Sequence, residues 1–260
     1  MNIFKQFWIS LYSPKDIAKF RFQKIGKTIL YVFLLVFLSS LPTIVFTSTG
    51  ISNGVKSFQE ALQNELPDFE IKEGTLYTDS SEVFVYQANN FSIYLDSTGA
   101  LTTEDVLNKE SNAFLLLPSE FVIITSGTAQ AQPYSMFENF TLSNTDILNF
   151  LDNTKGLLSI FIIVFAIIMY IFTAGIQFIE ISFLALVVLL FGNITGRKIQ
   201  YRHYWRLITY CLTLPIVFFM LMNFMQVQVI GGIYVKWGTA LVMFYLALKE
   251  IPKPKVKNQS

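Results

Sequence analysis

Residues 157–194 read LLSIFIIVFAIIMYIFTAGIQFIEISFLALVVLLFGNI, a run of 38 residues with one formal charge, Glu180. A membrane-spanning helix needs about 20 mostly apolar residues, because the hydrocarbon core is about 30 Å thick. The run is therefore too long for one minimal crossing and barely long enough for two. Either reading makes the chain an integral membrane protein.

The composition supports this fold class. The chain has 260 residues, of which 53% are hydrophobic and 14% are charged, against about 25% charged in an ordinary soluble domain. So few ionisable groups do not cover a globule of this size, and lipid is the solvent that replaces water. The single cysteine, Cys211, excludes intrachain disulfides, so any domain outside the membrane must fold on its own core.

The charges are distributed unevenly. Residues 1–27 hold six Lys or Arg and one Asp, a net charge of +5. Residues 50–155 hold four Lys, no Arg and fifteen Asp or Glu, a net charge of −11. Because Lys and Arg are in excess in cytoplasmic flanks, we expect the N-terminus in the cytoplasm and the acidic stretch outside.

We divide the chain into five parts. They are a cytoplasmic amphipathic basic segment (1–27), a first transmembrane helix (28–47), an extracytoplasmic α+β domain (48–155), a transmembrane helical block (156–248) and a basic cytoplasmic tail (249–260). The predicted fold class is an α-helical multi-pass membrane protein with a small inserted extracytoplasmic α+β domain.

Two topologies remain open for the membrane block. If residues 157–194 cross once, as a tilted or broken helix with Gly175 as a candidate break, the chain makes four crossings and the tail is cytoplasmic. If they form a hairpin between Gly175 and Glu180, the chain makes five crossings and the tail is external. The single crossing satisfies the charge rule better.

The inserted domain has a helix followed by short β-rich runs. Residues 51–66 place apolar side chains on one helical face, and Pro67 ends the helix. Six β-rich runs follow between residues 69 and 125: FEI, TLYT, VFVYQ, FSIYL, AFLLL and FVIIT. A second amphipathic helix is expected at 146–151. We predict a small sheet with the first helix packed on it.

The sequence contains little catalytic chemistry. Asp96-Ser97-Thr98-Gly99 differs from the D-[ST]-G of aspartic proteases by an extra residue, and we interpret it as a turn. The inserted domain has no His and no Cys for nucleophilic hydrolysis, and the sole histidine, His203, is expected to face solvent or headgroups. We predict no enzyme activity, no cofactor, no metal site and no nucleic-acid binding.

Ionisable residues inside membrane segments are candidate functional sites. They are Glu180 and Lys236, with Gln177 close by. Under four crossings Glu180 lies about 35 Å along its run from Leu157, and Lys236 about 14 Å along its run from Val227, at 1.5 Å per residue. We therefore expect the two about 20 Å apart in depth and unpaired, with Glu180 at the inner interface and Lys236 snorkelling or in a local polar contact.

A second candidate surface is aromatic and basic. Residues 2–12 have an aromatic face at helical spacing, and Ser13-Pro14 begins a second helix with Ser13 as N-cap. This segment is either a plain interfacial anchor or a docking surface for anionic lipid or a partner. The candidate inner-leaflet contacts are Phe4, Lys5, Trp8, Arg197, Lys198 and Arg202.

Three stretches carry a resemblance to a known family. They are FKQFWISLYSPKDIAKFRFQKIGKTILYVFLL, YRHYWRLITYCLTLPIVFFM and the closing KEIPKPK. They resemble a poorly characterised family of multi-pass membrane proteins from low-GC Gram-positive bacteria, one branch of which is named maltodextrin-utilisation protein. The W-R-L-x-x-Y-x-x-x-L-P part is also faintly similar to Yip-type membrane domains. The resemblance implies a location in the cell membrane and a link to carbohydrate uptake, and it implies no catalytic residues.

Two functional hypotheses follow. The first is a non-enzymatic accessory or sensor protein whose partners are membrane lipid and a membrane protein, such as a transporter or envelope complex. The alternative is a transport component in its own right, with a polar site around Glu180 and Lys236.

Overall fold

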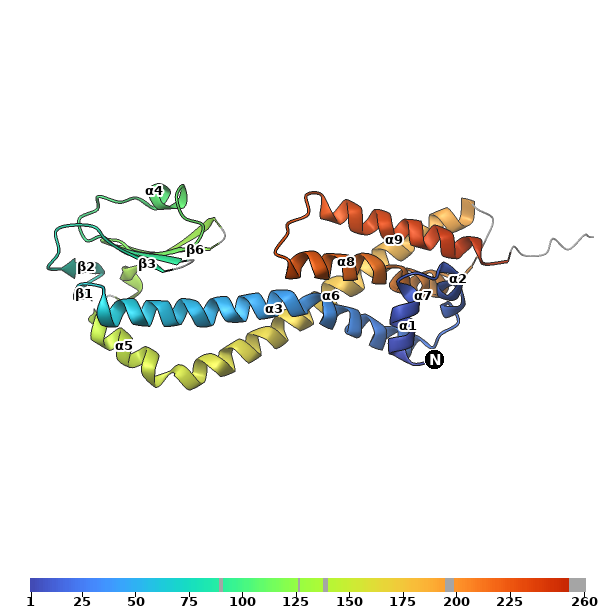
Figure 1. The fold of residues 1–260 in the computed structure, drawn as a ribbon, viewed down its shortest axis with the longest axis horizontal. Helices are drawn as coiled ribbons and strands as arrows, with labels where there is room; N and C mark the ends of the chain where they lie inside the picture. The colour runs from blue at the N-terminus through green and yellow to red at the C-terminus, as the bar shows by residue number, and fades with distance from the viewer. Residues whose placement is uncertain (89–90, 126, 138–139, 195–198, 253–260) are drawn as a thin grey trace, which may run out of the picture. The chain divides into compact units, whose positions relative to one another are not determined.

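The computed structural model describes residues 1–88, 91–125, 127–137, 140–194 and 199–252. By its internal contacts the chain forms two compact units (Figure 1). The helical unit comprises residues 1–46 and 163–260, and the sheet unit comprises Thr47–Ile162. The acidic part of the sequence therefore forms a unit inserted into the helical one.

The helical unit is built from seven helices, two of which it shares with the sheet unit. They are α1 (Ile3–Ser10), α2 (Pro14–Phe20), α3 (Ile25–Asn64), α6 (Lys155–Ile194), α7 (Tyr201–Cys211), α8 (Thr213–Phe224) and α9 (Gly232–Lys249). Within the described residues, three helical segments are long and apolar enough to cross a membrane: Ile25–Asn64, Gly156–Leu190 and Tyr201–Phe224. The predicted membrane-spanning helices are thus present.

The longest helices are continuous where the sequence left room for breaks. α6 runs unbroken through Gly175 and Glu180, so the alternative hairpin is not formed. α3 joins the expected transmembrane helix and the expected helix at 51–66 into one helix of 40 residues. Gly50 and Gly54 lie inside it and each costs about 1 kcal/mol relative to Ala, but propagation of an existing helix is favourable and overrides this cost.

Pro215 explains the one interruption among the shorter helices. Proline lacks an N–H and its ring disturbs the carbonyl of the residue four positions earlier, here Cys211. The helix assignment breaks at Leu212, between α7 and α8, while Leu212 N–H still donates to Ile208 and Ile216 N–H to Leu212. The two helices therefore form one nearly continuous segment.

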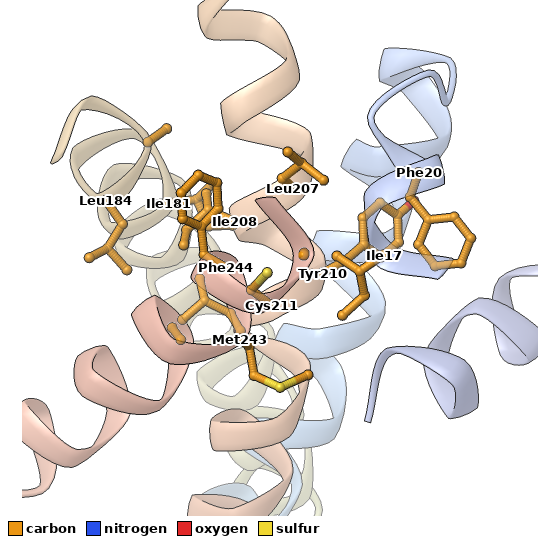
Figure 2. Packing of buried hydrophobic residues seen from close by; sticks show 14 of the residues in the cluster. Ile17, Phe20, Ile181, Leu184, Leu207, Ile208, Tyr210, Cys211, Met243 and Phe244 are labelled. Carbon is orange, nitrogen blue, oxygen red and sulfur yellow. The ribbon is translucent and has the colours of Figure 1, made fainter. Parts of the chain in front are cut away.

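The N-terminal segment takes part in the core of the helical unit. Ile17 and Phe20 of α2 are buried next to Tyr210 and Cys211 of α7 (Figure 2). Ser13 caps α2, because its side chain accepts a hydrogen bond from Asp16 N–H, as the sequence predicts. The segment is thus more than a surface anchor, since α2 packs between the membrane helices α7 and α9.

The sheet unit contains two sheets. Its strands are β1 (Phe69–Lys72), β2 (Thr75–Thr78), β3 (Phe84–Ala88), β4 (Phe91–Leu95), β5 (Ala113–Leu116), β6 (Glu120–Thr125), β7 (Thr128–Pro133) and β8 (Leu142–Ser143). The order is β2-β1-β8 in one sheet and β3-β4-β5-β6-β7 in the other. The pair β4 and β5 is parallel, while the other pairs within the described strands are antiparallel. The six predicted strands are confirmed, and β7 and β8 were not predicted.

Short helices cover and connect the sheets. α4 (Thr103–Leu107) links the parallel strands, a 3-10 turn spans Tyr134–Phe137, and α5 (Asn144–Asn153) leads into α6. Ala61, Leu62 and Leu66 at the end of α3 are buried with Ile93 and Leu95 of the larger sheet, so the predicted packing of this helix on the sheet is confirmed. Val106 of α4 is buried with residues of the opposite sheet face.

Candidate functional site

The polar cluster consists of Glu180 and Gln177 on α6 with Lys236 and Trp237 on α9. Lys236 Nζ lies 2.6 Å from Glu180 Oε2 and forms an ion pair with it. Gln177 Nε2 donates to the same oxygen at 2.9 Å, and Trp237 Nε1 donates to Glu180 Oε1 at 2.9 Å. The Glu180 and Lys236 side chains are 11% and 23% exposed. Both oxygens of the carboxylate are therefore satisfied by protein donors, as a charge in a low-dielectric region requires.

The expected separation of Glu180 and Lys236 is wrong. Counted from the C-terminal ends of their helices, Glu180 lies 14 residues before Ile194 and Lys236 lies 13 residues before Lys249. At 1.5 Å per residue these are about 21 and 20 Å, so the two side chains are level. The sequence estimate measured Glu180 from Leu157, but the first part of α6 belongs to the sheet unit, so the apolar run begins well before the helical unit does.

A groove of about 760 Å³ adjoins this cluster. Its lining is mainly apolar, with polar contributions from Ser39, Thr173, Gln177, Glu180, Asn223 and Lys236. The rim residues Ile176, Ile179 and Ile233 are 52%, 71% and 55% exposed, as expected for side chains that face lipid. The geometry gives an apolar groove with one neutral pair of charges at its wall.

The start of α9 is fixed by close packing. Gly231 has a φ of +68°, and a Cβ on Gly232 would lie 2.9 Å from Phe219 Cε1. A side chain at position 232 would displace that ring, which also lines the groove. The glycine pair therefore sets where α9 begins and, one turn later, where Lys236 meets Glu180.

α1 carries its polar and aromatic residues on unexpected sides. Gln6 and Ser10 are fully buried against the helical unit, whereas Phe4 and Trp8 are 64% and 66% exposed. Lys5 is exposed beside them. The aromatic face predicted from the sequence is thus present and points away from the protein. Among the other predicted inner-leaflet contacts, Arg202 is exposed, while Arg197 and Lys198 lie outside the described residues.

Basic residues of α7 hold the end of α2. His203 Nδ1 lies 2.7 Å from the Arg21 carbonyl oxygen, and Arg206 Nη1 donates to the same oxygen at 2.9 Å. Since a carbonyl only accepts, the proton of this contact is on Nδ1 of the imidazole. His203 is half-buried, and its ring packs edge-on against Phe22. The expectation that His203 is merely solvated is therefore wrong.

Asp96 forms the predicted turn. It is fully buried. Its Oδ1 accepts from Thr98 N, Thr98 Oγ1 and Gly99 N, and its Oδ2 accepts from Leu101 N at 2.7 Å. Burial opposes ionisation, but the Thr98 hydroxyl and these backbone N–H groups outweigh it and lower the pKa of the Asp96 carboxyl. The carboxylate is fully used by its own turn.

The described residues contain no group of three or more His, Cys, Asp or Glu side chains arranged to hold a metal ion. The main residue that sequence reasoning missed is Trp237. It follows Lys236 directly, and the pairing of its indole N–H with Glu180 depends on how α6 and α9 pack. The equal distances of Glu180 and Lys236 from the ends of their helices were the available signal.

Comparison with known proteins gives a family but no function. The family described as protein of unknown function (DUF1189) matches residues 4–248, and the chain belongs to it. No curated protein matches this sequence. No solved structure matches it either.

Proposed function

We propose that this chain is a multi-pass cell-membrane protein with four crossings, cytoplasmic termini and the sheet unit outside. α9 supplies the fourth crossing, because its 18 residues span about 27 Å at 1.5 Å per residue. The net charge of +5 in residues 1–27 and the net charge of −11 in residues 50–155 support this orientation. A membrane-impermeant maleimide tests it: Ser81→Cys in a Cys211→Ser background is labelled in intact cells if the sheet unit is outside.

Within this topology we propose a non-enzymatic accessory or sensor role. The observation that carries it is the continuity of α3 and α6, each of which contributes residues to both units over 40 residues. A long helix is a stiff connection, so a ligand or partner that binds the sheet unit can change the packing of the membrane helices. The partners would be membrane lipid and a membrane protein, such as a transporter or an envelope complex.

Crosslinking in native membranes tests the accessory role. The full chain carries a C-terminal tag, and a parallel sample lacks residues 48–155. Recovery of a transporter or envelope enzyme with the full chain, and its loss after the deletion, is the expected result. Recovery of only the tagged protein in both samples contradicts an accessory role. A deleted protein that no longer reaches the membrane is replaced by substitutions on the sheet surface.

The alternative is a transport component with a polar site around Glu180 and Lys236. The observation that favours it is that these residues and Gln177 line one groove. Against it stands the saturation of the Glu180 carboxylate by three protein donors, which leaves little capacity for a cargo. Combined Glu180→Gln and Lys236→Met substitutions separate the roles: a transporter loses uptake at normal protein level, whereas an accessory protein keeps its partner.

The link to carbohydrate uptake is part of the proposal and rests on the resemblance alone. Uptake of labelled maltodextrin by cells with and without the gene tests it, with glucose as the matched control sugar. Equal maltodextrin uptake in the two strains would remove this part of the proposal and leave the accessory role in place.

A further inference from the structure

We propose that the half-buried basic residues Arg21, His203 and Arg206 form a binding site for the phosphate group of an anionic phospholipid. The site lies where α2 ends against α7 (Figure 1). The inference goes beyond the accessory role and does not depend on the identity of any protein partner.

The first step is the gathering of three basic side chains around one carbonyl. His203 Nδ1 and Arg206 Nη1 both contact the Arg21 oxygen, at 2.7 and 2.9 Å. The Arg21 guanidinium carbon lies 4.2 Å from the centre of the Phe22 ring, and the other face of this contact is the His203 ring, whose centre is 5.7 Å from that of Phe22. The chain therefore concentrates positive charge at one place.

The second step is the lack of a compensating charge. Among the described residues, no carboxylate forms an ion pair with Arg21, His203 or Arg206, and the nearest acid in the sequence, Asp16, is paired with Lys19 at 2.7 Å. Each guanidinium has five N–H donors, and one nitrogen of Arg21 and one of Arg206 donate to described protein acceptors. Half-buried cations with unused donors in a fork geometry suit a phosphate group.

The third step identifies the source of the phosphate as a lipid. Exposed aromatic side chains lie on the same N-terminal segment, and aromatic rings of this kind are enriched at headgroup level. They are Phe4, Trp8, Tyr12 and Phe22, which are 64%, 66%, 72% and 70% exposed. A segment with a net charge of +5 and these rings matches a negatively charged leaflet. A soluble phosphate would use the cations but not the rings.

The test uses the purified full chain in detergent, titrated with phosphatidylglycerol or with phosphatidylcholine of the same acyl chains. Bound lipid is counted by native mass spectrometry. The unmodified chain is expected to prefer phosphatidylglycerol by about tenfold or more, the equivalent of one good charge-assisted contact. Combined Arg21→Gln and Arg206→Gln substitutions are expected to bring the two lipids close to parity.

Matched variants make the result specific. Lys15→Gln removes the same charge from an exposed position on α2 and is expected to change the preference by less than about twofold, because surface charge acts diffusely. Combined Arg21→Lys and Arg206→Lys keep charge and stem but lose the fork, so the preference should fall by at least about threefold. This pair also decides the question if the Gln variant fails to fold.

Three results would overturn the proposal. One is an unchanged preference in the Gln or Lys variants that fold, and another is an equal loss in Lys15→Gln. The third is complete displacement of phosphatidylglycerol by inorganic phosphate at a few millimolar, which would assign the cations to a soluble anion. Retention of the lipid in the presence of inorganic phosphate supports the lipid site.

Discussion

Glu180 in the helical unit and Asp96 in the sheet unit are two buried carboxylates that obtain their donors in different ways. Asp96 takes its hydrogen bonds from residues two to five positions further along the chain. Glu180 takes one from Gln177, three positions away, and two from Lys236 and Trp237, 56 and 57 positions away. The first arrangement is set by a local turn. The second exists only because α6 and α9 pack together, so the two carboxylates should respond differently to substitution.

The largest effect is expected where the partner is distant and charged. Lys236→Met leaves the Glu180 carboxylate charged without a counter-ion in a low-dielectric region, which costs about 3–5 kcal/mol. Adding Glu180→Gln removes the unpaired charge, so the double variant should recover most of the loss. Denaturant unfolding of the purified full chain measures both. If the single variant lies within about 1 kcal/mol of the unmodified chain, the pair contributes no more than a surface ion pair does.

A smaller and local effect is expected at Asp96. Asp96→Ala leaves several buried donors of the turn without an acceptor, at a cost of about 2–3 kcal/mol. Hydrogen exchange of the full chain should show reduced protection in β4 and β5 and unchanged protection in α7 to α9. Asp79→Ala, at an exposed aspartate of the same unit, is the control. Equal loss of protection in the helical unit would contradict a local role.

The same carboxylate gives the sheet unit a pH dependence. The pKa of Asp96 is lower in the folded chain than the unfolded value of about 3.9, because the turn donates hydrogen bonds to the charged form. The unfolded chain therefore binds more protons at acid pH, and this contribution to stability is complete above about pH 5 and is lost as pH falls through the folded pKa.

For a single group the slope cannot exceed about 1.4 kcal/mol per pH unit. Exchange protection of β4 and β5, corrected for the intrinsic exchange rate, should fall between pH 5 and pH 3. In Asp96→Asn the part of the slope that belongs to this residue should vanish. An identical pH profile in the two proteins would show that the turn does not carry the effect.

The same distinction between local and distant partners explains what the sequence could predict. The Ser13 cap, the Asp96 turn and the first six strands depend on neighbours within a few residues, and all were predictable. The ion pair was not, because its register depends on where each apolar run enters the helical unit. β7 was missed because its exposed, mostly polar residues show no buried face, as is common for an edge strand.

Predictability failed in the other direction at the N-terminus. The aromatic face of α1 was evident from helical spacing, but the burial of Gln6 and Ser10 on its opposite side was not. Polar residues at a spacing of four normally indicate a solvent face. Here that face contacts the helical unit, where Tyr210 Oη lies 3.5 Å from Gln6 Oε1. Only the packing of α1 against other helices shows which face is inside.

The smallest effect is expected at a purely local and exposed contact, the cap of α4. Thr102 Oγ1 accepts from Asp105 N–H at 3.3 Å, and Asp105 Oδ2 accepts from Thr102 N–H at 3.0 Å. Thr102→Ala removes one half of this capping box and should cost about 1 kcal/mol. Thr102→Ser keeps the hydroxyl and is the control.

Because Val106 of α4 is buried against the sheet, the loss at Thr102 should appear as faster exchange in α4 and in the strands beneath it. Full-chain hydrogen exchange resolves this from the helical unit. A loss as large as that of Lys236→Met would mean that local caps and distant charge pairs contribute alike, and the contrast between Asp96 and Glu180 would then not extend to the rest of the molecule.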